Sequence, residues 1–94
     1  MSDNYRNIIH EYLRNKPVLK AYLFGSFSRK SEEKESDIDI LVELEDQVDL
    51  YQFISMKLDL ENLLNREVDL ISQNGLSPRI KPYIDKEKIL IYEK

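Results

Sequence analysis

Residues 22–44 read YLFGSFSRKSEEKESDIDILVEL, and the rest of the chain is organised around this stretch. The apolar run that leads into it, Val18–Phe24, is broken only by one lysine and predicts a buried strand. Beyond a Gly-Ser pair and a charged segment, residues 38–44 alternate between two faces and predict a second strand. Side chains two residues apart on a strand share a face, so we expect Asp37 and Asp39 to point the same way, about 7 Å apart.

This pair of aspartates is a candidate metal site. Two carboxylates on one face repel each other unless positive charge lies between them. A hard divalent cation such as Mg²⁺ prefers oxygen ligands of this kind. The spacing therefore marks Asp37 and Asp39 as candidate metal ligands.

The Gly-Ser pair offers the other half of a nucleotide site. Gly25 lets the backbone approach a ligand closely, and a turn that opens into a helix presents amide N–H groups to a phosphate. We expect a short helix over residues 26–30, followed by a solvated charged loop. Ser26 adds a hydroxyl, and Arg29, one helical turn later, adds a guanidinium fork suited to phosphate oxygens. The stretch predicts a nucleoside triphosphate site.

Gly25-Ser26, ten intervening residues and Asp37-Ile38-Asp39 resemble the signature of the DNA polymerase beta-like nucleotidyltransferase superfamily. The surrounding segments LFGSFSR and SDIDILVEL resemble its smallest members, the minimal nucleotidyltransferases often paired with HEPN-domain toxins. The resemblance covers essentially the whole chain. It implies an α/β (α+β) fold in which a small mixed β-sheet is flanked by helices.

A third carboxylate lies farther along the chain. Residues 68–72 read as a strand, and Asp69 stands between two apolar residues. A carboxylate in an apolar strand needs a partner, and a half-exposed position or an ion pair would satisfy it as well as a metal. The resemblance implies a third metal carboxylate on this strand, in a Val-Asp-Leu setting that matches Asp69.

The resemblance also implies the reaction. A hydroxyl attacks the α-phosphorus of ATP and pyrophosphate leaves. Asp37 and Asp39 would hold two Mg²⁺ ions, and Asp69 would hold the ion beside the attacking hydroxyl and take its proton. Gly25 and Ser26 would bind the β- and γ-phosphates. Arg29 would neutralise charge as pyrophosphate departs.

Two other nucleotide or metal motifs are excluded by the same stretch. A P-loop is excluded because the chain has no Gly-Lys-Ser/Thr. An EF-hand is excluded because Ile38 and Ile40 belong to a strand and the loop glycine is absent.

Composition limits the remaining possibilities. We expect one domain spanning residues 1–94, with a modest core from 41% hydrophobic residues. A net charge of −4 argues against binding of nucleic acid, which needs a basic face. No cysteine is present to form disulfides, no apolar run reaches the ~20 residues that span a bilayer, and the polar N-terminus is unlike a secretory signal. We therefore expect no membrane association and a cytoplasmic location.

Helical patterns fill the rest of the chain. Residues 5–13 and a segment capped by Asp49 and ending near Asn65 show amphipathic spacing, the second with a stripe of Phe53, Met56, Leu60, Leu63 and Leu64. Asn74-Gly75 predicts a turn. A last helix is predicted to begin with Ser77 as cap and Pro78 in its first turn, burying Ile80, Tyr83 and Ile84. Residues 89–92 predict a short edge strand.

A domain of this size can form the triphosphate and metal site, but little remains to enclose an acceptor. The resemblance implies an antitoxin that transfers AMP from ATP to a tyrosine hydroxyl of a cognate HEPN ribonuclease toxin, within a hetero-oligomer. Two alternatives stay open, a non-catalytic antitoxin that neutralises the toxin by binding, and a nucleotidyltransferase that acts on a small-molecule hydroxyl.

Overall fold

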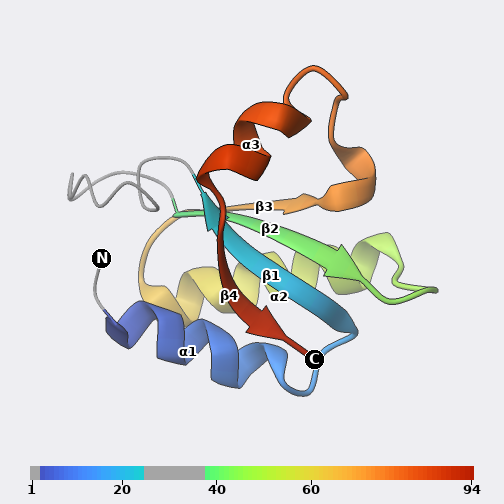
Figure 1. Cartoon of the computed structure of the whole chain (residues 1–94). Coiled ribbons are helices and arrows are strands. Elements are labelled where there is room, and N and C mark those ends of the chain that lie inside the picture. Colours follow the sequence, from blue (N-terminus) through green and yellow to red (C-terminus); the bar gives the residue numbers. More distant parts are fainter. Residues whose placement is uncertain (1–2, 25–37) are drawn as a thin grey trace.

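The three strands expected from alternation and apolar runs form where the sequence predicts them. The structure, a computed structural model, describes residues 3–24 and 38–94. Its elements in chain order are α1 (Asp3–Leu13), β1 (Val18–Phe24), β2 (Ile38–Leu44), α2 (Leu50–Leu64), β3 (Val68–Ser72), the short 3₁₀ helix η1 (Gln73–Gly75), α3 (Lys81–Glu87) and β4 (Ile89–Glu93) (Figure 1). The small mixed sheet with flanking helices is confirmed.

The four strands form one sheet in the order β3-β2-β1-β4. β1 pairs antiparallel with both β2 and β4, whereas β2 and β3 are parallel. Parallel neighbours need a crossover connection, and α2 supplies it. As a result, the first residues of β2 and β3 lie next to the last residues of β1, at one end of the strands.

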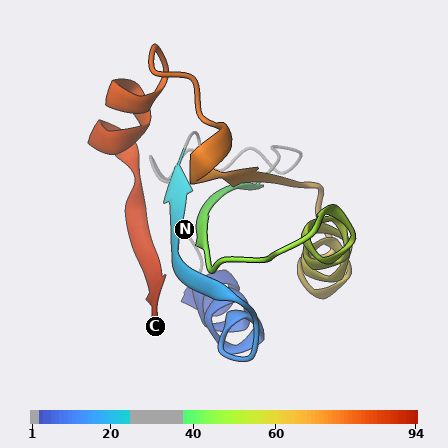
Figure 2. The same cartoon turned by 90° about the vertical axis from the view of Figure 1, so that its right-hand side faces the viewer.

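The helices α1 and α2 cover one face of this sheet, and α3 lies on the other side (Figure 2). The core between α1, α2 and the sheet is built from the apolar residues that alternate along the strands, including Val18, Ala21, Leu23, Ile38, Ile40, Val42, Val68 and Leu70. Side chains at the alternate positions of β2 and β3 point away from this core. We call that side, which carries Asp39, Leu41 and Asp69, the open face.

The ends of α2 follow from local chemistry. The Asp49 carboxylate accepts a hydrogen bond of 2.7 Å from the Gln52 backbone N–H, which confirms the predicted cap. At the other end, Asn65 adopts a left-handed conformation with φ of 54°, a common way for a helix to stop. The predicted helix from Asp49 to about Asn65 is confirmed.

The predicted start of the last helix is wrong. The segment after Ser77 forms a turn, in which the Ile80 and Lys81 backbone N–H groups both bond to the Ser77 carbonyl. α3 begins only at Lys81. The physical reason is Pro82, which lacks the N–H that a continuous helix would need at that position.

Three residues expected on buried helix faces are exposed instead. Ile80 and Tyr83 are 51% and 71% exposed, and only Ile84 of the predicted trio is buried. The later start of α3 leaves a helix of about two turns, which offers the sheet a single contact position. On α2, Leu60 and Leu64 lie on the helix face that packs against the core. Leu63 lies about 100° around the helix from Leu64, outside that face, and is 50% exposed.

Other predictions fall outside the described residues. Gly25, Ser26, Arg29 and Asp37 belong to the segment 25–37, as do the expected short helix and charged loop. None of the helices within residues 3–24 and 38–94 is long and apolar enough to cross a membrane.

Candidate active site

The structure brings two of the predicted carboxylates together. Asp39, second residue of β2, is the register partner of Asp69, second residue of the parallel strand β3. Directly opposed residues on neighbouring strands share a face and are separated by one strand spacing, about 4.8 Å. Two aspartates from segments 30 positions apart in the sequence thus lie side by side on the open face.

The end of β1 completes this edge. Phe24, the last residue of β1, is the antiparallel partner of Asp39, so Phe24, Asp39 and Asp69 form one row across three strands. Residues 25–37 connect Phe24 to Ile38 and carry the other predicted site residues, which lie outside the part of the chain that the structure describes.

The surroundings of the two carboxylates suit a ligand that arrives from solvent. Asp39 is half-buried and Asp69 is exposed. The next row of the open face, Tyr22, Leu41 and Ile71, is less polar, and Leu41 is fully buried. Among residues 3–24 and 38–94, no three His, Cys, Asp or Glu side chains gather closely enough to hold a metal ion. The predicted set of three includes Asp37, which is outside these ranges.

A residue that the sequence did not single out holds the beginning of β3. The Glu61 carboxylate, on α2, accepts hydrogen bonds of 3.0 Å from the Val68 backbone N–H and 3.2 Å from Lys57 Nζ. These bonds, the backbone one first, lower the pKa of Glu61 below its ordinary value of 4.5. Because Val68 directly precedes Asp69, this bond fixes the start of the strand that carries Asp69. The spacing of Lys57 and Glu61 predicts their ion pair, but the reach to Val68 is a tertiary contact.

Glu61→Gln is expected to lower the melting temperature at pH 7 and to flatten its decline in acid. A carboxyl whose pKa is depressed in the folded state stabilises the fold above its unfolded pKa, and that contribution is lost as pH falls through the folded pKa. Thermal melts between pH 2 and 7 would measure it. In Lys57→Met most of the decline should persist, because the larger cause, the Val68 N–H, remains. Superimposable curves for Glu61→Gln and the unmodified chain would contradict the assignment.

A second network ties α3 to the open face. The Tyr22 hydroxyl donates a hydrogen bond of 3.0 Å to the Glu43 carboxylate. Burial and this bond raise the pKa of Tyr22 to about 12, so the hydroxyl stays protonated at neutral pH. Lys88, which follows α3, holds its ammonium 4.3 Å from the centre of the Tyr22 ring and 2.9 Å from the Asp85 carboxylate. This cation–π contact and ion pair anchor the end of α3 beside β1.

Two cavities lined by described residues lie away from the carboxylate pair. One of about 250 Å³ is formed where α1 ends and α2 begins, and its lining includes Tyr12, Lys16, Asp49 and Asp59. A second, of about 510 Å³, lies against Leu19, Leu44 and Asp46, at the opposite end of β1 and β2 from Asp39.

The comparison with protein families matches residues 7–94 to the family described as Polymerase beta, Nucleotidyltransferase. Among curated relatives, a Methanocaldococcus jannaschii protein with the provisional name protein adenylyltransferase MJ0435 is 38% identical over 72 residues, 77% of each chain. Protein adenylyltransferase MntA of Thermococcus cleftensis is 35% identical over 69 residues, which cover 73% of this chain and 70% of the relative.

Solved structures show the same fold. A toxin-antitoxin structure with AMP-PNP matches 95% of this chain and 73% of its own, with a TM-score of 0.83 and 26% identity. A complex of the tri-AMPylated Shewanella oneidensis HEPN toxin with its MNT antitoxin matches 100% of this chain and 74% of the neighbour, with a TM-score of 0.78 and 25% identity.

Proposed function

The chain belongs to the Polymerase beta, Nucleotidyltransferase family, and from this premise we propose that it is a protein adenylyltransferase. It transfers AMP from ATP to a tyrosine hydroxyl of a HEPN-domain toxin and thereby acts as an antitoxin. The observation that carries the proposal is the register of Asp39 with Asp69 on the open face. The names of the relatives and the HEPN–MNT complex among the structural neighbours support the acceptor class.

The donor set fits a magnesium site. The two paired carboxylates supply only oxygen ligands, which hard divalent cations prefer, and both are reachable from solvent. We propose that Asp39 and Asp69 hold Mg²⁺ together with Asp37, which lies two positions before Asp39 on the same predicted face. When bound, Mg²⁺ neutralises phosphate charge and lowers the pKa of the attacking hydroxyl.

The chain's own residues then orient the reactants and move one proton. Gly25 and Ser26 bind the β- and γ-phosphates of ATP, and Arg29 stabilises the charge that develops on the departing pyrophosphate. Asp69, the more exposed carboxylate, accepts the proton of the tyrosine hydroxyl. The tyrosine oxygen forms a bond to the α-phosphorus, the bond between the α-phosphorus and the bridging oxygen breaks, and pyrophosphate leaves.

The acceptor is expected to complete the site. The carboxylate pair lies on a sheet face, where Asp39 is half-buried and Asp69 is exposed. Transfer in water competes with hydrolysis, so a reacting centre of this kind needs a cover that excludes solvent. A folded protein acceptor can supply that cover, and a hetero-oligomer of antitoxin and toxin follows from it.

Intact-mass spectrometry tests the proposal. The full chain, a HEPN-domain protein from the same genome, ATP and Mg²⁺ are incubated together, and each transfer should add about 329 Da to the HEPN protein, the mass of one AMP group. Peptide mapping should locate the addition on a tyrosine, and that tyrosine changed to phenylalanine should remain unmodified. Neutralisation of the toxin without a mass change, or transfer to a small-molecule hydroxyl instead, would contradict the proposal.

A further inference from the structure

The turn and helix that precede β4 carry positive charge that nothing in the described structure balances. We call residues 77–88 the α3 arm. It contains four cations and two anions, a net charge of +2, in a chain whose net charge is −4. Both anions are engaged: Asp85 pairs with Lys88, and Glu87 also makes an interaction.

The cations are distributed unevenly over the molecule. Within residues 3–24 and 38–94, most lysines and arginines pair with a carboxylate or stack on a ring, as do Arg14, Lys20 and Lys57. Among the cations of the described ranges, those without any such contact are Arg6, Arg79, Lys81 and Lys86. Three of these four belong to the α3 arm, so the arm presents a concentrated positive surface.

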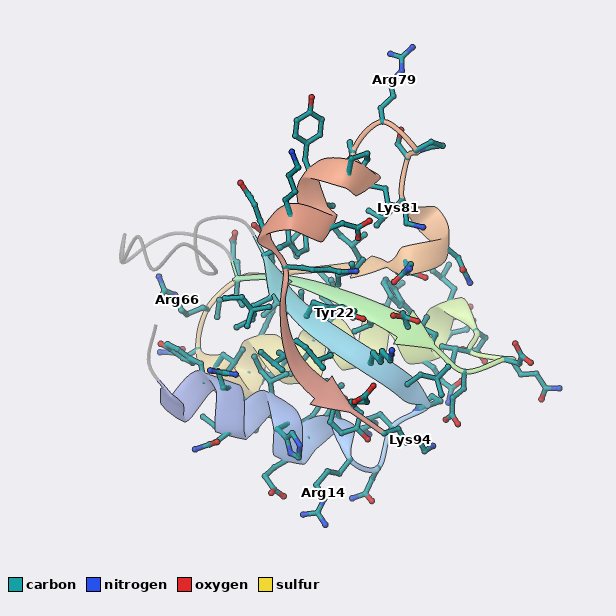
Figure 3. The ribbon with its side chains drawn as sticks, viewed as in Figure 1. Arg14, Tyr22, Arg66, Arg79, Lys81 and Lys94 are labelled. Carbon is teal, nitrogen blue, oxygen red and sulfur yellow. The ribbon has the colours of Figure 1, made fainter. Side chains whose placement is uncertain are left out.

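Exposed apolar side chains lie among these charges. Ile80 is 51% exposed and Tyr83 is 71% exposed. Tyr83 and Lys86 are three residues apart on α3 and therefore neighbours on one helix face, turned away from the buried Ile84. Figure 3 shows Arg79 at the outer tip of the arm, pointing away from the sheet, and Lys81 at the start of α3. Exposed apolar and cationic side chains are thus interleaved along the arm.

The arm is also held in place next to the carboxylate pair. Its end is anchored by Lys88 on Tyr22 and by the buried Ile84, and Ile89 directly after it pairs with Leu23, one residue before Phe24. Phe24 is in the same row as Asp39. A protein bound along the arm would therefore extend over the edge of the sheet at which that row lies.

We propose that the α3 arm is the docking surface for an acidic, apolar segment of the protein acceptor. This inference rests on the proposed function and adds the chemistry of the partner. Charge complementarity selects an acidic partner, because elsewhere the chain is acidic and would repel it. The interleaved Ile80 and Tyr83 favour a protein segment over a phosphate group, which has no apolar surface to cover them.

Peptide binding tests the arm directly. Two fluorescein-labelled amphipathic peptides, about 15 residues long, share a leucine and tyrosine face and differ only in carrying glutamates or lysines elsewhere. With the full chain and no ATP, fluorescence anisotropy should show about tenfold tighter binding of the glutamate peptide, weakening as salt rises. The triple variant Arg79→Glu, Lys81→Glu, Lys86→Glu should reverse the preference.

Matched controls separate the arm from net charge and from phosphate binding. Arg6→Glu changes the net charge as much as Lys81→Glu but lies on α1, so it should leave the preference intact. Equal loss in these two single variants, equal affinity for both peptides, or no binding of either would overturn the proposal. Displacement of the glutamate peptide by inorganic tripolyphosphate at constant ionic strength would also overturn it and make the arm a phosphate site.

The two proposals can fail separately. Because the binding assay contains no ATP, its outcome is independent of AMP transfer. A chain that modifies the HEPN protein yet binds both peptides equally would refute only the docking surface. A chain that prefers the glutamate peptide but transfers nothing would refute only the adenylyltransferase assignment.

Discussion

Asp39→Asn is expected to lower AMP transfer by about 100- to 1,000-fold, the scale of a lost group that stabilises charge in a transition state. The substitution keeps the shape of the side chain and removes the charge that, with Asp69, makes this point of the open face a cation site. Asp69→Asn should cause a loss of similar size, because it removes a ligand and the proposed proton acceptor together. Initial rates of label transfer from ATP to the HEPN protein would measure both.

Glu43→Gln is the matched control for this prediction. Glu43 lies on the same strand and the same face as Asp39, at the other end, where its carboxylate accepts the Tyr22 hydrogen bond. A glutamine can still accept that bond, so transfer should stay close to that of the unmodified chain. All three variants should melt as cooperatively as the unmodified chain. Unchanged turnover in Asp39→Asn, or an equal loss in Glu43→Gln, would show that the carboxylate pair is not the catalytic centre.

Leu41→Ala is expected to lower the free energy of unfolding by about 2–5 kcal/mol, the usual cost of emptying a fully buried leucine site. Leu41 has no exposed surface although it points to the open face. The cost is a large share of the roughly 5–14 kcal/mol that stabilises a domain of this size. Because Leu41 lies between Tyr22 and Ile71 in register, its loss should loosen the surface beside the α3 arm.

Chemical denaturation followed by circular dichroism would measure this loss, and Leu58→Ala provides the control. Leu58 lies on α2 and is 51% exposed, so its truncation should change the free energy of unfolding by only about 0.5 kcal/mol. If Leu41→Ala were as stable as Leu58→Ala, the open face would not be packed as described.

Local pattern predicted most of the elements of this protein. The alternation along residues 38–44 and the apolar run of residues 18–24 predicted β2 and β1 within the bounds that form, because period and burial are properties of neighbouring residues. The Asp49 cap of α2 was equally local. The motif that joins Gly25 and Ser26 to Asp37 and Asp39 predicted the family, although Gly25, Ser26 and Asp37 lie outside the described chain.

Tertiary structure decided what the pattern could not. The sequence offered Asp69 as a strand aspartate with several possible partners, and only the parallel register of β2 and β3 places it beside Asp39. The path of α2 and the Glu61 bond to Val68 set that register across distant parts of the chain. Ile80 and Tyr83, predicted as core, became surface because Pro82 delayed α3 and left the sheet one contact, Ile84. Helical period predicts which residues share a face, but the partner that a face meets depends on contacts between segments distant in sequence.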